Sequence, residues 1–158
     1  MNQIYKSNNI RVLHDETSEL LSIEWKGIVD IEEFKNGMEA LLNQSSQIPK
    51  CKVIFNFEHM LEITTEARIW FQDYFLKDRG FDFLSKTDKL AFIMPYGIMP
   101  RFIVESLQEL CLNTCPKLNS ESFGNVKEAS DWINSNSESP NPVTMSHSVV
   151  FARSFKQQ

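Results

Sequence analysis

The stretch Lys52–Phe57, KVIFNF, decides the fold class. Val53, Ile54 and Phe55 are apolar in succession, without the alternation that marks a strand with one face in water. A run of this kind is typical of a strand that is covered on both faces, as in a parallel sheet packed between helices. Lys89–Met94, KLAFIM, has the same pattern. The two runs therefore predict an α/β protein with two inner strands.

An antiparallel hairpin is expected upstream of these strands. Ile10 and Val12 alternate with polar neighbours, and Asp15–Glu19, DETSE, supplies turn residues. In Leu21–Trp25 every second residue is again apolar. One face of this hairpin should pack on a core while the other stays partly in water.

Apolar residues at helical spacing predict about four helices, which begin near Asp30, Thr64 or Thr65, Arg101 and Asn125. Asp30 with Glu33 fits a capping box, and Gly80 fits a left-handed position after the second helix. The aromatic residues of that helix indicate either deep burial or the lining of a cavity or partner surface. A short strand is expected at Ser120–Phe123. The order of elements predicts a single-domain mixed β-sheet of four to five strands, with the hairpin at its amino end and the helices packed on it.

Composition limits the classes of function. The 158 residues fit one domain and carry a net charge of −5, which argues against a nucleic-acid partner. No apolar run is long enough to cross a bilayer, and the start lacks the pattern of a signal peptide. Three cysteines do not form a disulfide framework, so we expect a cytoplasmic protein with reduced thiols. Cys111 and Cys115 are expected to be buried and inert, and no metal or cofactor is expected.

The end of the chain differs in composition. Residues 1–134 are expected to form the domain, while residues 135–158 start with a linker rich in Ser, Asn and Pro. The apolar stretch VVFARSF at residues 149–155 follows this linker. It is expected to dock as a tail on this chain or on a neighbouring copy. A homodimer is therefore one of the expected assemblies.

Four segments resemble the SpoIIAA-like family, whose members are STAS-type domains related to the anti-sigma-factor antagonists and grouped with lipid carriers of the CRAL-TRIO type. The similarity covers Ile10–Asn134, and its most specific parts are Trp-Lys-Gly and the closing Phe-x-x-x-x-Glu-Ala-x-x-Trp-Ile. The segments are Leu20–Leu42, Lys50–Met60, Lys89–Met94 and Phe123–Ile133.

The resemblance also implies a phosphorylation site. Antagonist proteins carry a phosphorylatable serine at the start of the helix after the inner strand, and Thr65 lies near that place without the usual Asp-Ser-Ser-Gly. Asn56 stands where those proteins have an aspartate at the strand end. The residues themselves favour a simpler role, in which Thr64 or Thr65 caps the helix.

Four residues are candidates for ligand or partner binding: Asn56, His59, Tyr96 and Arg101. They follow the two inner strands, and open α/β sheets place their sites at the carboxyl ends of such strands. His59 is expected in a loop. The sequence lacks GxSxG, a Walker-type phosphate loop and GxGxxG, which argues against an enzyme and leaves no residue assigned as catalytic. An enzymatic site would require Glu58, His59, Tyr96 and Arg101 to converge in one cleft.

Two functions remain open at this stage. The first is a non-enzymatic regulatory module of STAS type that binds a protein partner near Asn56–Met60, NFEHM, and Pro95–Pro100, PYGIMP. The alternative is a carrier or sensor of a small apolar or amphipathic ligand such as a lipid, suggested by the twelve phenylalanines.

Overall fold

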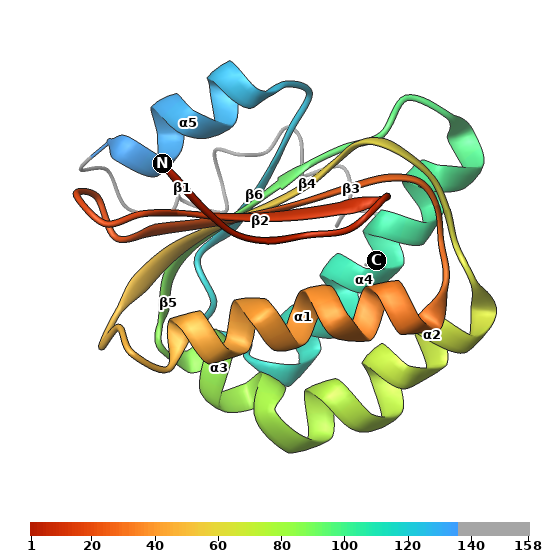
Figure 1. Ribbon diagram of the computed structural model, residues 1–158, viewed down its shortest axis with the longest axis horizontal. Helices are drawn as coiled ribbons and strands as arrows, with labels where there is room; N and C mark the ends of the chain where they lie inside the picture. Colours follow the sequence, from red (N-terminus) through yellow and green to blue (C-terminus); the bar gives the residue numbers. More distant parts are fainter. Residues whose placement is uncertain (136–158) are drawn as a thin grey trace.

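A six-stranded mixed sheet forms the centre of the fold in the computed structural model, which describes residues 1–135 (Figure 1). The strands lie side by side in chain order, the first three antiparallel and the remaining pairs parallel. They are β1 (Asn2–Lys6), β2 (Ile10–Asp15), β3 (Leu20–Val29), β4 (Cys51–Ile63), β5 (Thr87–Ile93) and β6 (Ser120–Phe123). The hairpin and the parallel inner strands were predicted correctly. The count of four to five strands missed β1, a mostly exposed edge strand of five residues without a clear apolar face.

The helices cover the two faces of the sheet unequally. Figure 1 shows α5 on one face and the other helices on the opposite face, which is where right-handed crossovers between successive parallel strands must place them. The expected number of four holds for continuous helical runs, because α2, η1 and α3 join without a break. The helical segments are α1 (Ile31–Ser45), α2 (Thr65–Trp70), the π-helix η1 (Phe71–Gly80), α3 (Phe81–Ser85), α4 (Ile98–Thr114) and α5 (Val126–Asn134).

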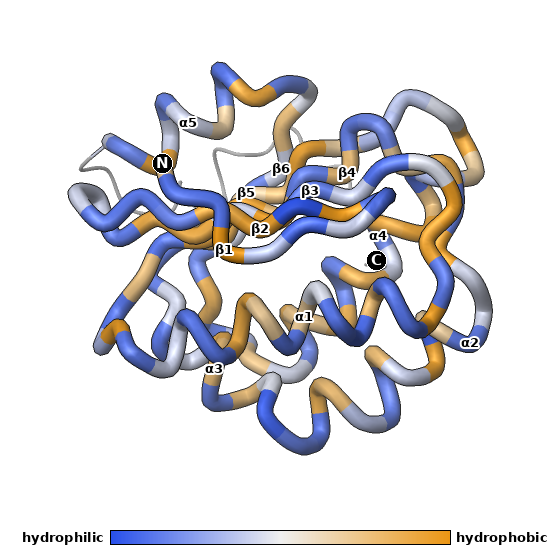
Figure 2. The backbone as a smooth tube through the Cα atoms, viewed as in Figure 1, coloured by the Kyte–Doolittle hydropathy of each residue, from blue (hydrophilic) through white to orange (hydrophobic). Residues whose placement is uncertain are grey.

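The inner strands are covered on both faces, as KVIFNF predicted. Phe55 and Phe57 belong to the large core under α1, η1 and α4, whereas Ile54 belongs to a small core under α5. Hydrophobic residues accordingly recur along the inner strands in Figure 2. The small core consists of Leu20, Ile54, Ala91, Ile93, Ala129 and Ile133. Cys111 and Cys115 are buried, as expected from the sequence. Burial raises the pKa of Cys111 to about 12.

The start of α1 confirms half of the predicted capping box. Asp30 Oδ1 accepts a hydrogen bond from the Glu33 amide at 2.9 Å. The Glu33 carboxylate does not return to Asp30; it accepts from Ser7 Oγ at 2.9 Å and from Asn9 Nδ2 at 2.7 Å. The loop between β1 and β2 lies within reach of this carboxylate and supplies it with more donors than one backbone amide. Glu33 therefore fastens the edge hairpin to α1.

The helix after β4 contains a ten-residue π-helix that the sequence did not reveal. Gly80 was expected to end this helix in the left-handed region, and that prediction is wrong because its φ is −65° and its ψ is −38°. A Cβ atom on Gly80 would lie 2.9 Å from the carbonyl oxygen of Phe75. Glycine is needed here for close approach within the widened helix. Tyr74, expected to face inward, is exposed, while Phe71 and Phe75 are buried.

Replacing Gly80 with alanine is expected to lower the free energy of unfolding by about 1–2 kcal/mol, because the added methyl group meets a backbone oxygen that cannot easily move. In an ordinary helix the same change stabilises by up to about 1 kcal/mol. Urea denaturation followed by circular dichroism measures the difference. Gly124→Ala is the matched control, since its Cβ would meet no atom within 4 Å. A stabilised Gly80→Ala variant would contradict the close approach.

Candidate functional site

Strand β4 extends beyond the apolar run Lys52–Phe57 to Ile63, and two of the candidate residues, Asn56 and His59, lie in this strand. Its pairing with β5 ends at Asn56, opposite Ile93, but its pairing with β3 continues to Ile63, opposite Val29. His59 therefore lies in a strand, and its predicted position in a loop is wrong. The strand continues because β3 extends to Val29 and offers it a partner beyond the end of β5.

A polar row crosses four strands on the face of the sheet that carries α5. Lys6 pairs with Arg11, Arg11 with Glu24, and Glu24 with Asn56, so the four side chains follow one another in register. Beside this row, Lys26 of β3 pairs with His59 of β4. These residues line a cavity of about 290 Å³, which we call the row pocket. Its complete lining is Lys6, Ser7, Asn9, Ile10, Arg11, Glu24, Trp25, Lys26, Asn56 and His59.

Two of the four predicted binding residues, Asn56 and His59, thus share one pocket. Its basic residues were missed. Their polar positions in the hairpin show only that they face water, and the register that aligns them with Asn56 is not visible in one sequence. The alternation of polar residues along the hairpin is the one signal that could have suggested a common face.

Tyr96 lies against the end of this pocket. Its hydroxyl donates a hydrogen bond to Glu58 Oε2 at 2.8 Å, and its ring centroid lies 6.4 Å from that of His59. His59 Nε2 is 3.8 Å from Glu58 Oε1. The hydrogen bond to Glu58 raises the pKa of Tyr96, because the phenol must stay protonated to donate it. Glu58, His59 and Tyr96 therefore form one contact group.

Arg101 does not join this group. It lies in the first turns of α4, and its Nη2 donates to the Pro95 carbonyl at 3.4 Å. Among residues 1–135 it has no hydrogen bond or ion pair with Glu58, His59 or Tyr96. Three of the four residues required by the enzymatic interpretation converge, and the fourth is held by its own loop.

The start of α2 resolves the two threonines. Thr64 is the N-cap, and its Oγ1 accepts a hydrogen bond from the Ala67 amide at 3.3 Å. Thr65 is the exposed first helical residue, and its Oγ1 accepts from Arg68 Nη2 at 3.2 Å. Capping is thus the work of Thr64, and phosphorylation of Thr65 stays a prediction. In α4, whose N-cap is Gly97, Pro100 occupies the third helical position.

Six large apolar side chains are exposed near this end of the sheet, and we call them the edge patch. Their exposed fractions lie between 58% and 76%. The patch consists of Ile28, Leu61, Tyr96, Ile98, Met99 and Phe102.

The members of the edge patch come from three segments that meet. His59 and Leu61 flank the buried Met60 in β4 and so share a face, while Ile28 of β3 pairs with the next residue, Glu62. The hydrogen bond from Tyr96 to Glu58 brings the start of α4 beside this strand. Figure 1 shows the loop before α4 next to the ends of β3 and β4.

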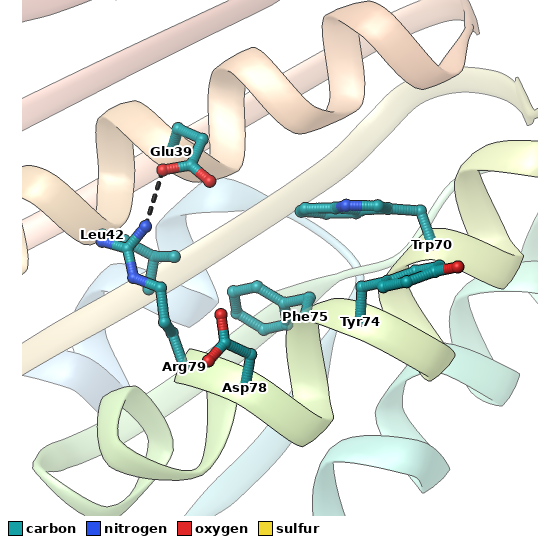
Figure 3. A pocket seen from close by; sticks show the side chains of 7 residues that line it. All are labelled: Glu39, Leu42, Trp70, Tyr74, Phe75, Asp78 and Arg79. Atoms are coloured by element: carbon teal, nitrogen blue, oxygen red, sulfur yellow. Dashed lines mark hydrogen bonds and ion pairs between the residues drawn. The ribbon is translucent and has the colours of Figure 1, made fainter.

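A second, smaller pocket lies between α1 and η1 (Figure 3). It has a volume of about 100 Å³, with Trp70 and Tyr74 at one end. At the other end Arg79 Nη1 lies 2.6 Å from Glu39 Oε1 and ties the two helices together. Space for a few waters does not suit a ligand of ordinary size. The aromatic helix therefore serves mainly the core.

The fold is of the SpoIIAA-like class. A crystal structure of an uncharacterised DUF3478-family protein from Shewanella loihica PV-4, described as having a SpoIIAA-like fold, is similar to this chain with a TM-score of 0.57 and 17% sequence identity. The match covers 82% of this chain and 98% of that one. At this identity the likeness shows the fold alone, and it confirms the fold expected from the resemblance. No protein-family model and no curated protein sequence matches the chain.

Other expectations concern membranes, metals and the tail. Within residues 1–135 no helix has both the length and the apolar character to span a membrane. The same residues contain no group of three or more His, Cys, Asp or Glu side chains placed to hold a metal ion. The predicted linker begins at Ser135, which is the last described residue. The rest of the linker and the apolar stretch at residues 149–155 lie outside the described residues.

Proposed function

We propose that this protein is a non-enzymatic regulatory module of STAS type that binds a partner protein through the edge patch. The observation that carries the proposal is the gathering of six exposed apolar side chains at one end of the sheet. Isolated exposed apolar residues are ordinary, but a contiguous group from several segments marks an interaction surface. The SpoIIAA-like fold supports a STAS-type module in general terms.

The partner should present an apolar face, such as one side of an amphipathic helix. In α4, Ile98 and Phe102 are four residues apart and Met99 and Phe102 three apart, so they form one ridge on the exposed side of the helix. A second apolar ridge can pack along this one. The aromatic members, Tyr96 and Phe102, are of the kind that contribute most at interfaces.

A lipid carrier receives less support. Its motivation was the phenylalanine content, yet seven phenylalanines are buried as packed core residues. These are Phe34, Phe55, Phe57, Phe71, Phe75, Phe83 and Phe92. One observation still favours an amphipathic ligand, because His59 of the row pocket lies beside Tyr96 of the edge patch. Native mass spectrometry of protein from its own cells tests this second candidate, which a bound amphipathic molecule would support.

Replacing Phe102 with aspartate is expected to weaken partner binding at least tenfold, since a charge at the middle of an apolar interface must be desolvated without a counter-charge. Affinity capture with the tagged full-length chain from native cells, quantified by mass spectrometry, measures the loss. Phe81→Asp is the matched control, because Phe81 is similarly exposed, at 52% against 61% for Phe102, and lies on α3 outside the edge patch.

Equal recovery of the partner by wild type and Phe102→Asp would contradict the proposal. Light scattering on both proteins identifies a different occupant. A wild-type dimer that Phe102→Asp dissociates would show that a second copy of this chain covers the edge patch, in place of a separate partner.

A further inference from the structure

We propose that the row pocket binds a small organic anion through a carboxylate or phosphate group. The pocket has a volume of about 290 Å³ and is formed by residues of four neighbouring strands and the loop that follows β1. This size lies at the small end of the usual range for ligand sites, about 300–1,000 Å³. The inference does not depend on the proposed partner binding, because the edge patch and the row pocket have no residue in common.

The charge of the lining favours an anion. Three of its residues, Lys6, Arg11 and Lys26, are basic, and only Glu24 is acidic, in a chain whose net charge is −5. Arg11 forms an ion pair with Glu24, with Nη2 and Nε at 2.9 Å and 3.2 Å from the same carboxylate oxygen. Lys6 and Lys26 form no ion pair with any residue of the described part of the chain. Two cations are thus available to a ligand.

Two nearby carboxylates lie outside the lining of the row pocket. Glu33 accepts hydrogen bonds from Ser7 and Asn9 and is not part of the lining. Glu58 accepts the Tyr96 hydroxyl on the far side of His59. Both carboxylates are therefore already engaged with donors of the protein, and neither lines the pocket.

Asn56 supplies a positioned neutral donor. Its side chain is nearly buried, with the residue 8% exposed, and its Oδ1 accepts a hydrogen bond from the Glu58 amide at 3.0 Å. This bond fixes the amide orientation. Its Nδ2 has no hydrogen-bond acceptor among residues 1–135, although the residue lines the pocket. Nδ2 is not one of the fully buried side-chain atoms that lack a partner, so it is open to the pocket and can donate to an oxygen of a bound anion.

The floor of the pocket is formed by the sheet and not by apolar side chains. Ile10 and Trp25 belong to the lining, but their side chains are packed in the large core on the opposite face of the sheet. The side chains that face the pocket are polar or charged, so a small polar anion fits this lining. The anionic group would lie between Lys26 and Asn56 on neighbouring strands, while Lys6, three strands away from Asn56, would add a longer-range attraction.

The test is a titration of the ¹⁵N-labelled full-length chain, at constant ionic strength, with inorganic phosphate in one arm and with acetate and citrate in another. We expect saturable shifts of the Asn56 side-chain amide and of the Lys26 and His59 backbone amides. The arm with the tighter dissociation constant identifies the preferred group. Lys26→Glu should weaken binding about tenfold, since it replaces an attractive charge at close range with a repulsive one.

The control is Lys117→Glu, which makes the same charge change at an exposed lysine outside the pocket and should leave the dissociation constant within about twofold. Lys26 is also exposed, so both variants are expected to fold, and circular dichroism verifies this. Shifts that do not saturate, or that both variants reduce equally, would overturn the proposal. The proposal would also be overturned if Lys26→Glu abolished binding of an acidic protein segment but did not change the affinity for small anions. The pocket would then hold a side chain of a partner protein.

Discussion

Replacing Trp25 with alanine is expected to lower the free energy of unfolding by about 3–5 kcal/mol, as for other large aromatic residues removed from a core. Trp25 is 2% exposed and lies at the centre of the aromatic core. Its ring stacks on Phe57 with centroids 4.4 Å apart and contacts Phe34 and Phe55 at 5.7 Å and 5.6 Å. Alanine would leave a cavity bounded by rings from β4 and α1, which those elements cannot close without moving apart from their own neighbours.

Urea denaturation followed by far-ultraviolet circular dichroism measures this loss without depending on tryptophan fluorescence. Trp25→Phe is the matched control and should cost clearly less. It keeps an aromatic ring and removes an indole N–H that has no hydrogen-bond partner in the described part of the chain. A loss below about 1 kcal/mol for Trp25→Ala would mean that the surrounding rings collapse into the space.

Lys89→Met is expected to lower the free energy of unfolding by about 2 kcal/mol and to loosen α5 from the sheet. Lys89 is 5% exposed in β5, and its ammonium group reaches the end of α5. Nζ donates to the carbonyls of Trp132 and Ser135, each at 2.8 Å, and to Ser135 Oγ at 3.1 Å. It also lies 5.0 Å from the Trp132 ring centroid. Carbonyl oxygens at a helix end bind a cation favourably.

Burial acts against this contact, because desolvation lowers the pKa of Lys89. Methionine keeps the length of the stem but not the donors, so the variant separates the two effects. Hydrogen exchange of the α5 amides, together with denaturation, measures the result. Lys127→Met is the control, since Lys127 forms an exposed pair with Asp131 at 2.9 Å and should contribute at most about 0.5 kcal/mol. A stabilised Lys89→Met variant would show that the desolvation of the ammonium group destabilises the fold by more than its hydrogen bonds stabilise it.

The fold could be predicted from the sequence wherever burial leaves a local pattern. KVIFNF and KLAFIM are apolar because they are covered on both faces, and Asp30 and Asn125 mark helix starts through their caps. β1 and the π-helix leave no such pattern. The first is an exposed edge strand, and the second depends on the close approach of Gly80 to Phe75, which arises only once the helix is packed.

The candidate site was predicted in part for the same reason. Asn56 and His59 lie near the carboxyl end of the apolar run in β4 and Tyr96 follows β5, so the rule for carboxyl ends of parallel strands brought them together. The basic residues of the row pocket depend on cross-strand register, which a single sequence does not contain. Ile98 and Met99 belong to PYGIMP, near which partner binding was predicted, but their own exposure could not be foreseen, because an apolar residue in a sequence is more often buried than exposed.

The strand order has a consequence for folding during synthesis. Every strand pairs with its neighbours in the chain, so the sheet can grow one strand at a time as the polypeptide leaves the ribosome. The large core closes along the way, but the small core waits for α5, which is made after all six strands. Until then Ile54 and Ile93 face the surroundings on an uncovered sheet. The nascent chain therefore passes through a stage in which one apolar face of the sheet is uncovered. Lys89 of β5 is synthesised before α5 and is available to bind the end of this helix when it packs on that face.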